Sequence, residues 1–281
     1  MKSLNSYITE GGFFKNVGAT QIKPKDKQEL VKIIDDTISK QGLNCDLNFI
    51  DTSKIEDMSA LFYKSDFTGD ISKWDVSKVK NMSKMFANSK FNGDISKWDV
   101  SKVENMGSMF YRSSFTGDIS NWNVRNVKNM EYMFYYSSFT GDISKWDVSN
   151  VTSMSAMFNN SKFDGDISNW DVRNVKNMEY MFAKSIFNGD ISKWNVKNVK
   201  KMSFMFANSS FTGDISKWDV SKVENTMYMF ASSKFNGDIS KWNVSNVKNM
   251  SSMFYNSKLE KLNKIPSWYK NKIIGDKYGK R

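Results

Sequence analysis

The chain has 281 residues, a formal net charge of +11, no histidine, one cysteine and eighteen methionines. These counts exclude histidine-based catalysis, histidine-ligated zinc or haem, and a disulfide framework within the chain. Apolar residues make up 40% and aromatic residues 15%, which is too much for a disordered polypeptide. No apolar run approaches the roughly 20 residues of a membrane span. We therefore expect a folded, soluble protein of a reducing compartment.

Residues 1–24 are predicted to form a leader and linker. The opening segment MKSLNSYITE, followed by two glycines, lacks the apolar core of a secretory signal. Its triplet Ile8-Thr9-Glu10 before Gly11 resembles the cleavage site of head-targeting propeptides of large tailed bacteriophages. That resemblance implies a cut between Glu10 and Gly11, and a protein that is packaged into a virion.

Residues 25–45 are predicted to form an N-terminal capping helix. Pro24 precedes the segment, and Gly42 is placed to stop the helix. Its apolar residues fall on one face of a helix, as expected for an element that covers the first unit of a repeat array. These residues are Leu30, Val31, Ile33, Ile34 and Ile38.

Residues 46–261 contain nine tandem units of 24 residues. One unit reads DISKWDVSKVKNMSKMFANSKFNG, from Asp70 to Gly93. The glycine and the tryptophan recur at this period through eight units, whereas the first, weaker unit has Ile50 in place of tryptophan. The tryptophans are Trp74, Trp98, Trp122, Trp146, Trp170, Trp194, Trp218 and Trp242.

Each unit combines two periodicities. Trp74 and Val76 lie two apart, which predicts one face of a strand over residues 71–76. The apolar residues of 79–86 lie three and one apart, which predicts a short helical or 3-10 segment. A strand and a helical turn in each unit favour an α/β repeat solenoid of the leucine-rich-repeat type, with parallel strands and about nine coils.

The unit also carries a recognisable motif. The pattern Val79-x-x-Met82-x-x-Met85-Phe86-x-x-Ser89-x-Phe91, followed by Ile95-x-x-Trp98-x-Val100, resembles the BspA-like leucine-rich repeats. More closely, it is similar to a mycoplasma-type repeat family of unknown function. The resemblance implies a horseshoe-shaped or straight solenoid, a bacterial or bacteriophage source, and an interaction role, often at cell surfaces. Because the chain shows no signal peptide, we expect the cytoplasm of the producing bacterium, or alternatively a phage virion.

Two columns of equivalent residues have competing interpretations. The tryptophans form either a buried core ladder, which we favour, or an exposed platform for sugars or bases. The aspartates after each glycine either cap turns, which we favour, or share Ca²⁺ ions between units. These aspartates are Asp70, Asp94, Asp118, Asp142, Asp166, Asp190, Asp214 and Asp238.

Two sets of residues are candidates for binding. The first is a monotonous pair of rows on the outer strand face, which suits a repetitive surface ligand; it includes Lys97, Asp99, Lys145, Asp147, Lys217 and Asp219. The second varies between units and is rich in tyrosine, which favours a protein contact, although packing between units is the alternative. It comprises Tyr111, Tyr132, Tyr135, Tyr180, Phe204 and Tyr228.

Residues 262–281 are predicted to form the C-terminal cap and a basic tail. Eight basic and two acidic residues lie in 258–281, so we expect only weak, non-specific nucleic-acid binding there. We expect no enzymatic activity and no cofactor. The sequence favours a non-enzymatic interaction module or adhesin-like protein of bacterial or phage origin, with a virion component as the alternative and a nucleic-acid binder third. The oligomeric state is left open.

Overall fold

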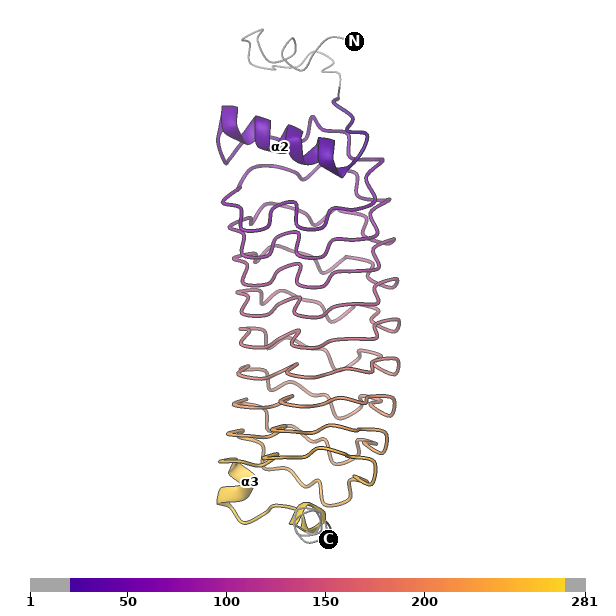
Figure 1. Cartoon of the computed structure of the whole chain (residues 1–281), viewed down its shortest axis with the longest axis vertical. Helices are drawn as coiled ribbons and strands as arrows, with labels where there is room; N and C mark the ends of the chain where they lie inside the picture. The colour runs from indigo at the N-terminus through magenta and orange to yellow at the C-terminus, as the bar shows by residue number, and fades with distance from the viewer. Residues whose placement is uncertain (1–20, 271–281) are drawn as a thin grey trace, which may run out of the picture.

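The computed structural model describes residues 21–270. Helix α2 (Lys27–Gln41) lies at one end of a stack of chain turns, and helix α3 (Lys258–Lys261) lies at the other (Figure 1). We call each 24-residue turn of the stack a coil. The predicted leader cleavage at Glu10 and Gly11 and the last part of the basic tail lie outside the described residues.

Helix α2 covers the first coil. Its N-cap is Asp26, whose carboxylate accepts a hydrogen bond from the Glu29 amide at 2.9 Å. Leu30, Ile33 and Ile34 are buried in the core. The helix is shorter than the predicted range of 25–45 because Gly42 ends it in the left-handed region, with φ of 88°.

Hydrogen bonds between neighbouring coils hold the stack together. Along one side of each coil, alternate amides donate to the next coil: the Met82 amide to the Asn105 carbonyl at 2.9 Å, and the Phe86 amide to the Met109 carbonyl at 3.0 Å. The intervening amides close local turns, such as Met85 to Met82 and Ser89 to Phe86. Parallel bridges between Asn81 and its equivalents fix the register at 24 residues.

The strand predicted over residues 71–76 is absent from the structure. Ser72 and Lys73 form a turn instead, and the Trp74 amide bonds back to the Ile71 carbonyl at 3.1 Å. The Asp70 carboxylate accepts the Ser72 amide at 2.8 Å, which removes a donor that a neighbouring strand would need. Within the described residues, the contacts of sheet type outside the helices are isolated bridges.

The helical segment predicted over residues 79–86 is also absent. Two consecutive four-residue turns, 82–85 and 86–89, take its place. Lys84 and Asn88, the third residues of these turns, have φ of 58° and 55°. A left-handed residue in every fourth position cannot continue a right-handed helix. Whether the fold belongs to the leucine-rich-repeat class stays a prediction.

The tryptophans form a core ladder. Trp146 is 3% exposed, and its indole Nε1–H donates to the Ile119 carbonyl of the preceding coil at 3.1 Å. The equivalent bond recurs from Trp74 to Trp242. Because these rings are buried, the alternative of an exposed sugar- or base-stacking platform does not hold.

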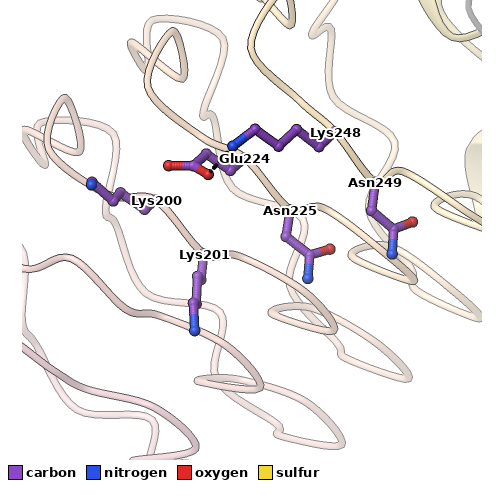
Figure 2. A pocket seen from close by; sticks show the side chains of 6 residues that line it. All are labelled: Lys200, Lys201, Glu224, Asn225, Lys248 and Asn249. Carbon is purple, nitrogen blue, oxygen red and sulfur yellow. Dashed lines mark hydrogen bonds and ion pairs between the residues drawn. The ribbon is translucent and has the colours of Figure 1, made fainter.

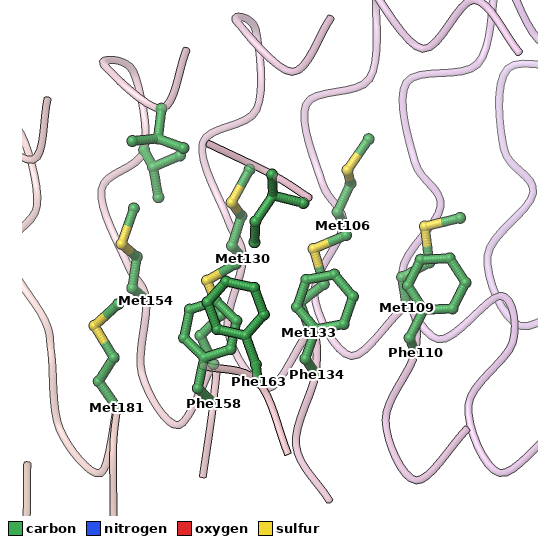
Figure 3. Close-up of a cluster of buried hydrophobic side chains, with 14 of the residues drawn as sticks. Met106, Met109, Phe110, Met130, Met133, Phe134, Met154, Phe158, Phe163 and Met181 are labelled. Atoms are coloured by element: carbon green, nitrogen blue, oxygen red, sulfur yellow. The ribbon is translucent and has the colours of Figure 1, made fainter. Parts of the chain in front are cut away.

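Phenylalanine and methionine complete the core. Phe134 stacks on Phe158 of the next coil with ring centroids 5.8 Å apart, and a second column places Phe139 and Phe163 6.5 Å apart. Methionine side chains fill the space beside these rings (Figure 3). The repeated glycine makes room for the second column, since a Cβ on Gly141 would lie 2.8 Å from a Phe139 ring atom.

The C-terminal segment extends the ladder by one rung. Trp268 donates its indole hydrogen to the Ile239 carbonyl at 3.1 Å, as the repeat tryptophans do one coil earlier. Leu259 and Tyr269 are buried with it, so residues 259–269 cover the last coil. Among the described residues, no helix is long and apolar enough to cross a bilayer.

The tryptophan ladder can be tested by truncation. We expect Trp146→Ala to lower the free energy of unfolding by about 3–5 kcal/mol, because it leaves a cavity and an unpaired Ile119 carbonyl. Lys145→Ala, at an exposed neighbour, should cost less than about 0.5 kcal/mol. Urea denaturation followed by tryptophan fluorescence measures both, and equal costs would contradict the ladder.

One rung of the methionine column is imperfect. Thr226 stands where the other coils have methionines such as Met202 and Met250. It is 2% exposed, and its hydroxyl has no hydrogen-bond partner among residues 21–270. A buried hydroxyl without a partner keeps its desolvation cost and gains nothing in return.

Replacing this hydroxyl should therefore stabilise the protein. We expect Thr226→Val, which keeps the shape and removes the polar atom, to raise the free energy of unfolding by about 1 kcal/mol. Ser209→Ala is the matched control, because the Ser209 hydroxyl accepts the Phe211 amide at 3.0 Å and its loss should destabilise. If Thr226→Val lowered the urea midpoint instead, the hydroxyl would have a partner in solution.

Candidate interaction surface

The variable aromatic residues lie at a special backbone position. Tyr132, Tyr180, Phe204 and Tyr228 each occupy the third residue of the first turn, with φ between 54° and 58°. A bulky side chain is unusual in this left-handed region, which costs about 1–2 kcal/mol for residues other than glycine. Other coils place small or flexible residues there, such as Lys84.

The aromatic residues form two stacks. The first joins Tyr111 and Tyr135 with ring centroids 4.8 Å apart at 7°, and Tyr132 leans on Tyr135 at 5.9 Å. The second stack joins Tyr180 to Phe204 at 4.6 Å and Phe204 to Tyr228 at 4.9 Å. All six residues singled out from the sequence therefore belong to one of the two stacks.

A single coil separates the two stacks. Its residue in the same column is Ala156, which is only 1% exposed. Burial, followed by the charges of Glu179 and Tyr132, raises the pKa of Tyr180. A buried alanine therefore separates the two stacks in this column.

Two carboxylates accompany the tyrosines. The Ser153 hydroxyl donates to Glu131 at 2.5 Å, and the Ser203 hydroxyl donates to Glu179. Burial, followed by the charges of Glu131 and Glu179, raises the pKa of Tyr132. Like the phenol of an ordinary tyrosine, that of Tyr132 is protonated at neutral pH and can donate a hydrogen bond.

Sequence reasoning missed Arg112. Its guanidinium lies over the rings of Tyr111 at 5.6 Å and Tyr136 at 5.4 Å, an arrangement that favours cation–π attraction. Arg112 and Tyr136 are also left-handed, with φ of 49° and 51°, and Tyr136 is 56% exposed. Their place in one column of the repeat, beside the tyrosines, is the signal that could have identified them.

The stacking geometry limits what this surface can bind. Phe204 is covered on both faces by Tyr180 and Tyr228, so a sugar or base cannot stack on it. Tyr180 is exposed at the surface, whereas Phe204 and Tyr228 are half-buried. A broad surface of that kind suits contact with another polypeptide, where tyrosine is often the residue that dominates binding.

Comparison with known families identifies the repeat. Residues 32–140, 112–210, 135–233 and 187–274 match the family described as "Mycoplasma protein of unknown function, DUF285". The chain belongs to this family. The predicted tandem repeat and its similarity to the mycoplasma-type family are thereby confirmed, whereas the BspA-like assignment and the bacterial or phage source stay predictions. No curated protein and no solved structure matches this DUF285 chain.

The monotonous rows lie on exposed turns of the DUF285 coils and not on strands. Asp147 accepts the Ser149 amide at 3.1 Å, and Asp219 accepts the Ser221 amide at 3.0 Å. Hydrogen bonds from these serines lower the pKa of both carboxyls. The Asp99 carboxylate accepts the Ser101 amide at 3.0 Å, so these aspartates already have a local structural role. Lys97, Lys145 and Lys217 are exposed beside them.

The aspartate column caps turns. Asp142 accepts the Ser144 amide at 2.9 Å, and the same bond recurs through the column. The serine amide is the main reason that the pKa of Asp142 lies below its usual value. Within residues 21–270 no group of three ligating side chains could hold a metal ion.

This column makes the fold sensitive to acid. A carboxyl whose pKa is lowered by folding stabilises the protein above its unfolded pKa of about 4, and that contribution is lost as the pH falls through the folded pKa. We expect the thermal midpoint to fall below about pH 4. The triple variant Asp118→Asn/Asp142→Asn/Asp166→Asn keeps the acceptors and should show a shallower fall. An unchanged acid profile in that variant would show that the column does not control acid sensitivity.

Proposed function

We propose that this protein is a non-enzymatic protein-interaction module whose contact surface is the pair of aromatic stacks. The observation that carries the proposal is the placing of four bulky aromatic residues at left-handed positions. The fold does not require them, because Ser108 and Ser252 fill the same position in other coils.

The energies support a role in binding more than a role in stability. Each ring stack contributes about 0.5–1.5 kcal/mol, which is comparable with the cost of a left-handed residue of about 1–2 kcal/mol. Tyr132, with one tilted neighbour, gains less than Phe204 with two. The rings therefore bring little net stability, but the stacks hold them in fixed positions, which lowers the entropy lost on binding.

The remaining polar groups favour binding over catalysis. The chain has no histidine, and Glu131 and Glu179 each accept a hydroxyl hydrogen bond inside the surface. The family description supports a mycoplasmal, hence bacterial, source. An adhesin-like role and a cytoplasmic location are part of the proposal. The alternative of a virion protein depends on residues 1–11, which lie outside the described part of the chain.

The proposal predicts that partner proteins depend on the second stack. We expect Tyr180→Ser/Phe204→Ser to lose partners that the immobilised full chain enriches from the producing organism, since truncating a binding hot spot costs about 2 kcal/mol or more. Serine is compatible with the turn because Ser108 and Ser252 occupy it. Quantitative mass spectrometry of the bound proteins measures the loss.

The matched control is Lys145→Ser/Lys217→Ser, which changes two exposed residues outside the stacks. It should keep the same partners, and tryptophan fluorescence should show that both variants fold. Equal enrichment by the stack variant and the wild-type protein would contradict the proposal, and so would the absence of any enriched protein.

A further inference from the structure

One column of equivalent residues, from Glu56 to Lys248, alternates in charge except in its middle coils. In the first coils acidic and basic residues alternate, so that Lys80 pairs with Glu56 at 2.8 Å and Lys128 with Glu104 at 2.6 Å. In the same column, Lys176 and Lys200 follow one another in adjacent coils, joined by a backbone bond of 2.9 Å. Alternation at this spacing stabilises, whereas two adjacent lysines repel each other.

A third lysine joins them from the neighbouring column. Lys201 stands where most coils have asparagine, as in Asn177 and Asn225. Within residues 21–270, Lys176, Lys200 and Lys201 form none of the ion pairs that other lysines of the stack make. The unit 190–213 contains four lysines and a single aspartate, so it carries excess positive charge.

Lys200 and Lys201 border an open hollow. It has a volume of about 290 Å³ and is lined by Lys200, Lys201, Glu224, Asn225, Lys248 and Asn249 (Figure 2). Glu224 is already bound by Lys248 at 2.7 Å, and that bond is the main cause of its lowered pKa. A comparable hollow near Lys80 and Lys128 differs because the carboxylates Glu56 and Glu104 pair with those two lysines.

The basic cluster adjoins the second aromatic stack. Lys201 lies three residues before Phe204 in the same coil, and Ser203 between them holds Glu179. Lys176 precedes Tyr180 by four residues in the coil before. The exposed lysines and the aromatic stack therefore belong to the same coils, three or four residues apart along the chain.

We propose that this surface binds an extended acidic segment of a partner protein, with carboxylates at Lys176, Lys200 and Lys201 and apolar side chains against the Tyr180–Phe204–Tyr228 stack. The inference rests on the proposed function and specifies the chemistry of its partner. Charge complementarity favours this occupant, because carboxylates would replace the acidic residues that the interrupted column lacks.

Two other occupants fit less well. A second copy would have to offer its acidic first coil, but there Lys80 binds Glu56 at 2.8 Å and Lys27 binds Asp57 at 3.2 Å. A nucleic acid would find no open ring face on Phe204 for a base to stack on, because Tyr180 and Tyr228 cover both of its faces. A polypeptide needs no such stacking face.

The test uses the full chain and a fluorescent peptide in which glutamate alternates with leucine. Fluorescence anisotropy should show binding that weakens with added salt. Lys200→Thr/Lys201→Asn introduces residues that the chain itself uses in these columns, Thr152 and Asn177. We expect this variant to bind the peptide about tenfold more weakly or worse. Lys80→Thr/Lys128→Thr also removes two positive charges, both from the column of Lys200, and should bind as the wild-type protein does.

Three outcomes would overturn the inference: no binding of the alternating peptide, equal binding by the Lys200→Thr/Lys201→Asn variant, or equal binding of duplex DNA or of a peptide with lysine in place of glutamate. Failure here is distinct from failure of the proposed function. If the acidic peptide does not bind, but Tyr180→Ser/Phe204→Ser still loses its protein partners, the interaction role stands and only the acidic partner is excluded.

Discussion

The ladder of hydrogen bonds between coils is the constraint on which the rest of the structure depends. Because alternate amides, such as those of Met82 and Phe86, donate to the next coil, the amides between them must be satisfied locally. They close four-residue turns, and the turns 82–85 and 86–89 place their third residues, Lys84 and Asn88, in the left-handed region. Backbone satisfaction, the 24-residue register and the strained positions are thus consequences of one bonding pattern.

That pattern explains why the period and the core could be predicted from sequence, but the local elements could not. The recurrence of Trp74, Val76 and Phe86 requires a repeated buried position, whatever the backbone between them does. The spacing of three between Met82 and Met85 fits a 3-10 segment and a pair of turns equally well. Asparagine at Asn88 and Asn160 hinted at left-handed residues, but Lys84 and Tyr132 gave no such hint.

The candidate site was predictable only in part, for a related reason. Comparing one column across the units identified Tyr132, Tyr180 and Phe204, because a position that varies in an otherwise uniform repeat can be recognised in the amino-acid sequence. Their stacking depends on the backbone, which turns each ring outward and places it one coil from the next ring; the amino-acid sequence alone does not show this. The net charge of the chain does not reveal the lysine cluster. Lys128 and Lys248 each pair with a glutamate of the preceding coil, whereas Lys200 and Lys201 form no ion pair among the described residues.

The structure separates stability from recognition along the coil. Tryptophan, phenylalanine and methionine point inward and bond or stack with the adjacent coils, so a change there is felt by both neighbours. The left-handed position projects a side chain that the core does not use, and it accepts serine, lysine, alanine or tyrosine. A repeat built in this way can change its contact surface one coil at a time.

Stacking nevertheless couples the exposed residues to one another. Phe204 covers one face of Tyr180 and one face of Tyr228, so removing it frees both neighbouring rings and enlarges their rotational freedom. Replacing Phe204 should therefore cost more binding free energy than the contacts of Phe204 alone would supply. Replacing Tyr228 as well should then cost less than it does in the wild-type protein, because the Tyr228 ring has already lost its stacking partner. The second stack consequently acts as one rigid unit in which the three rings hold one another in place.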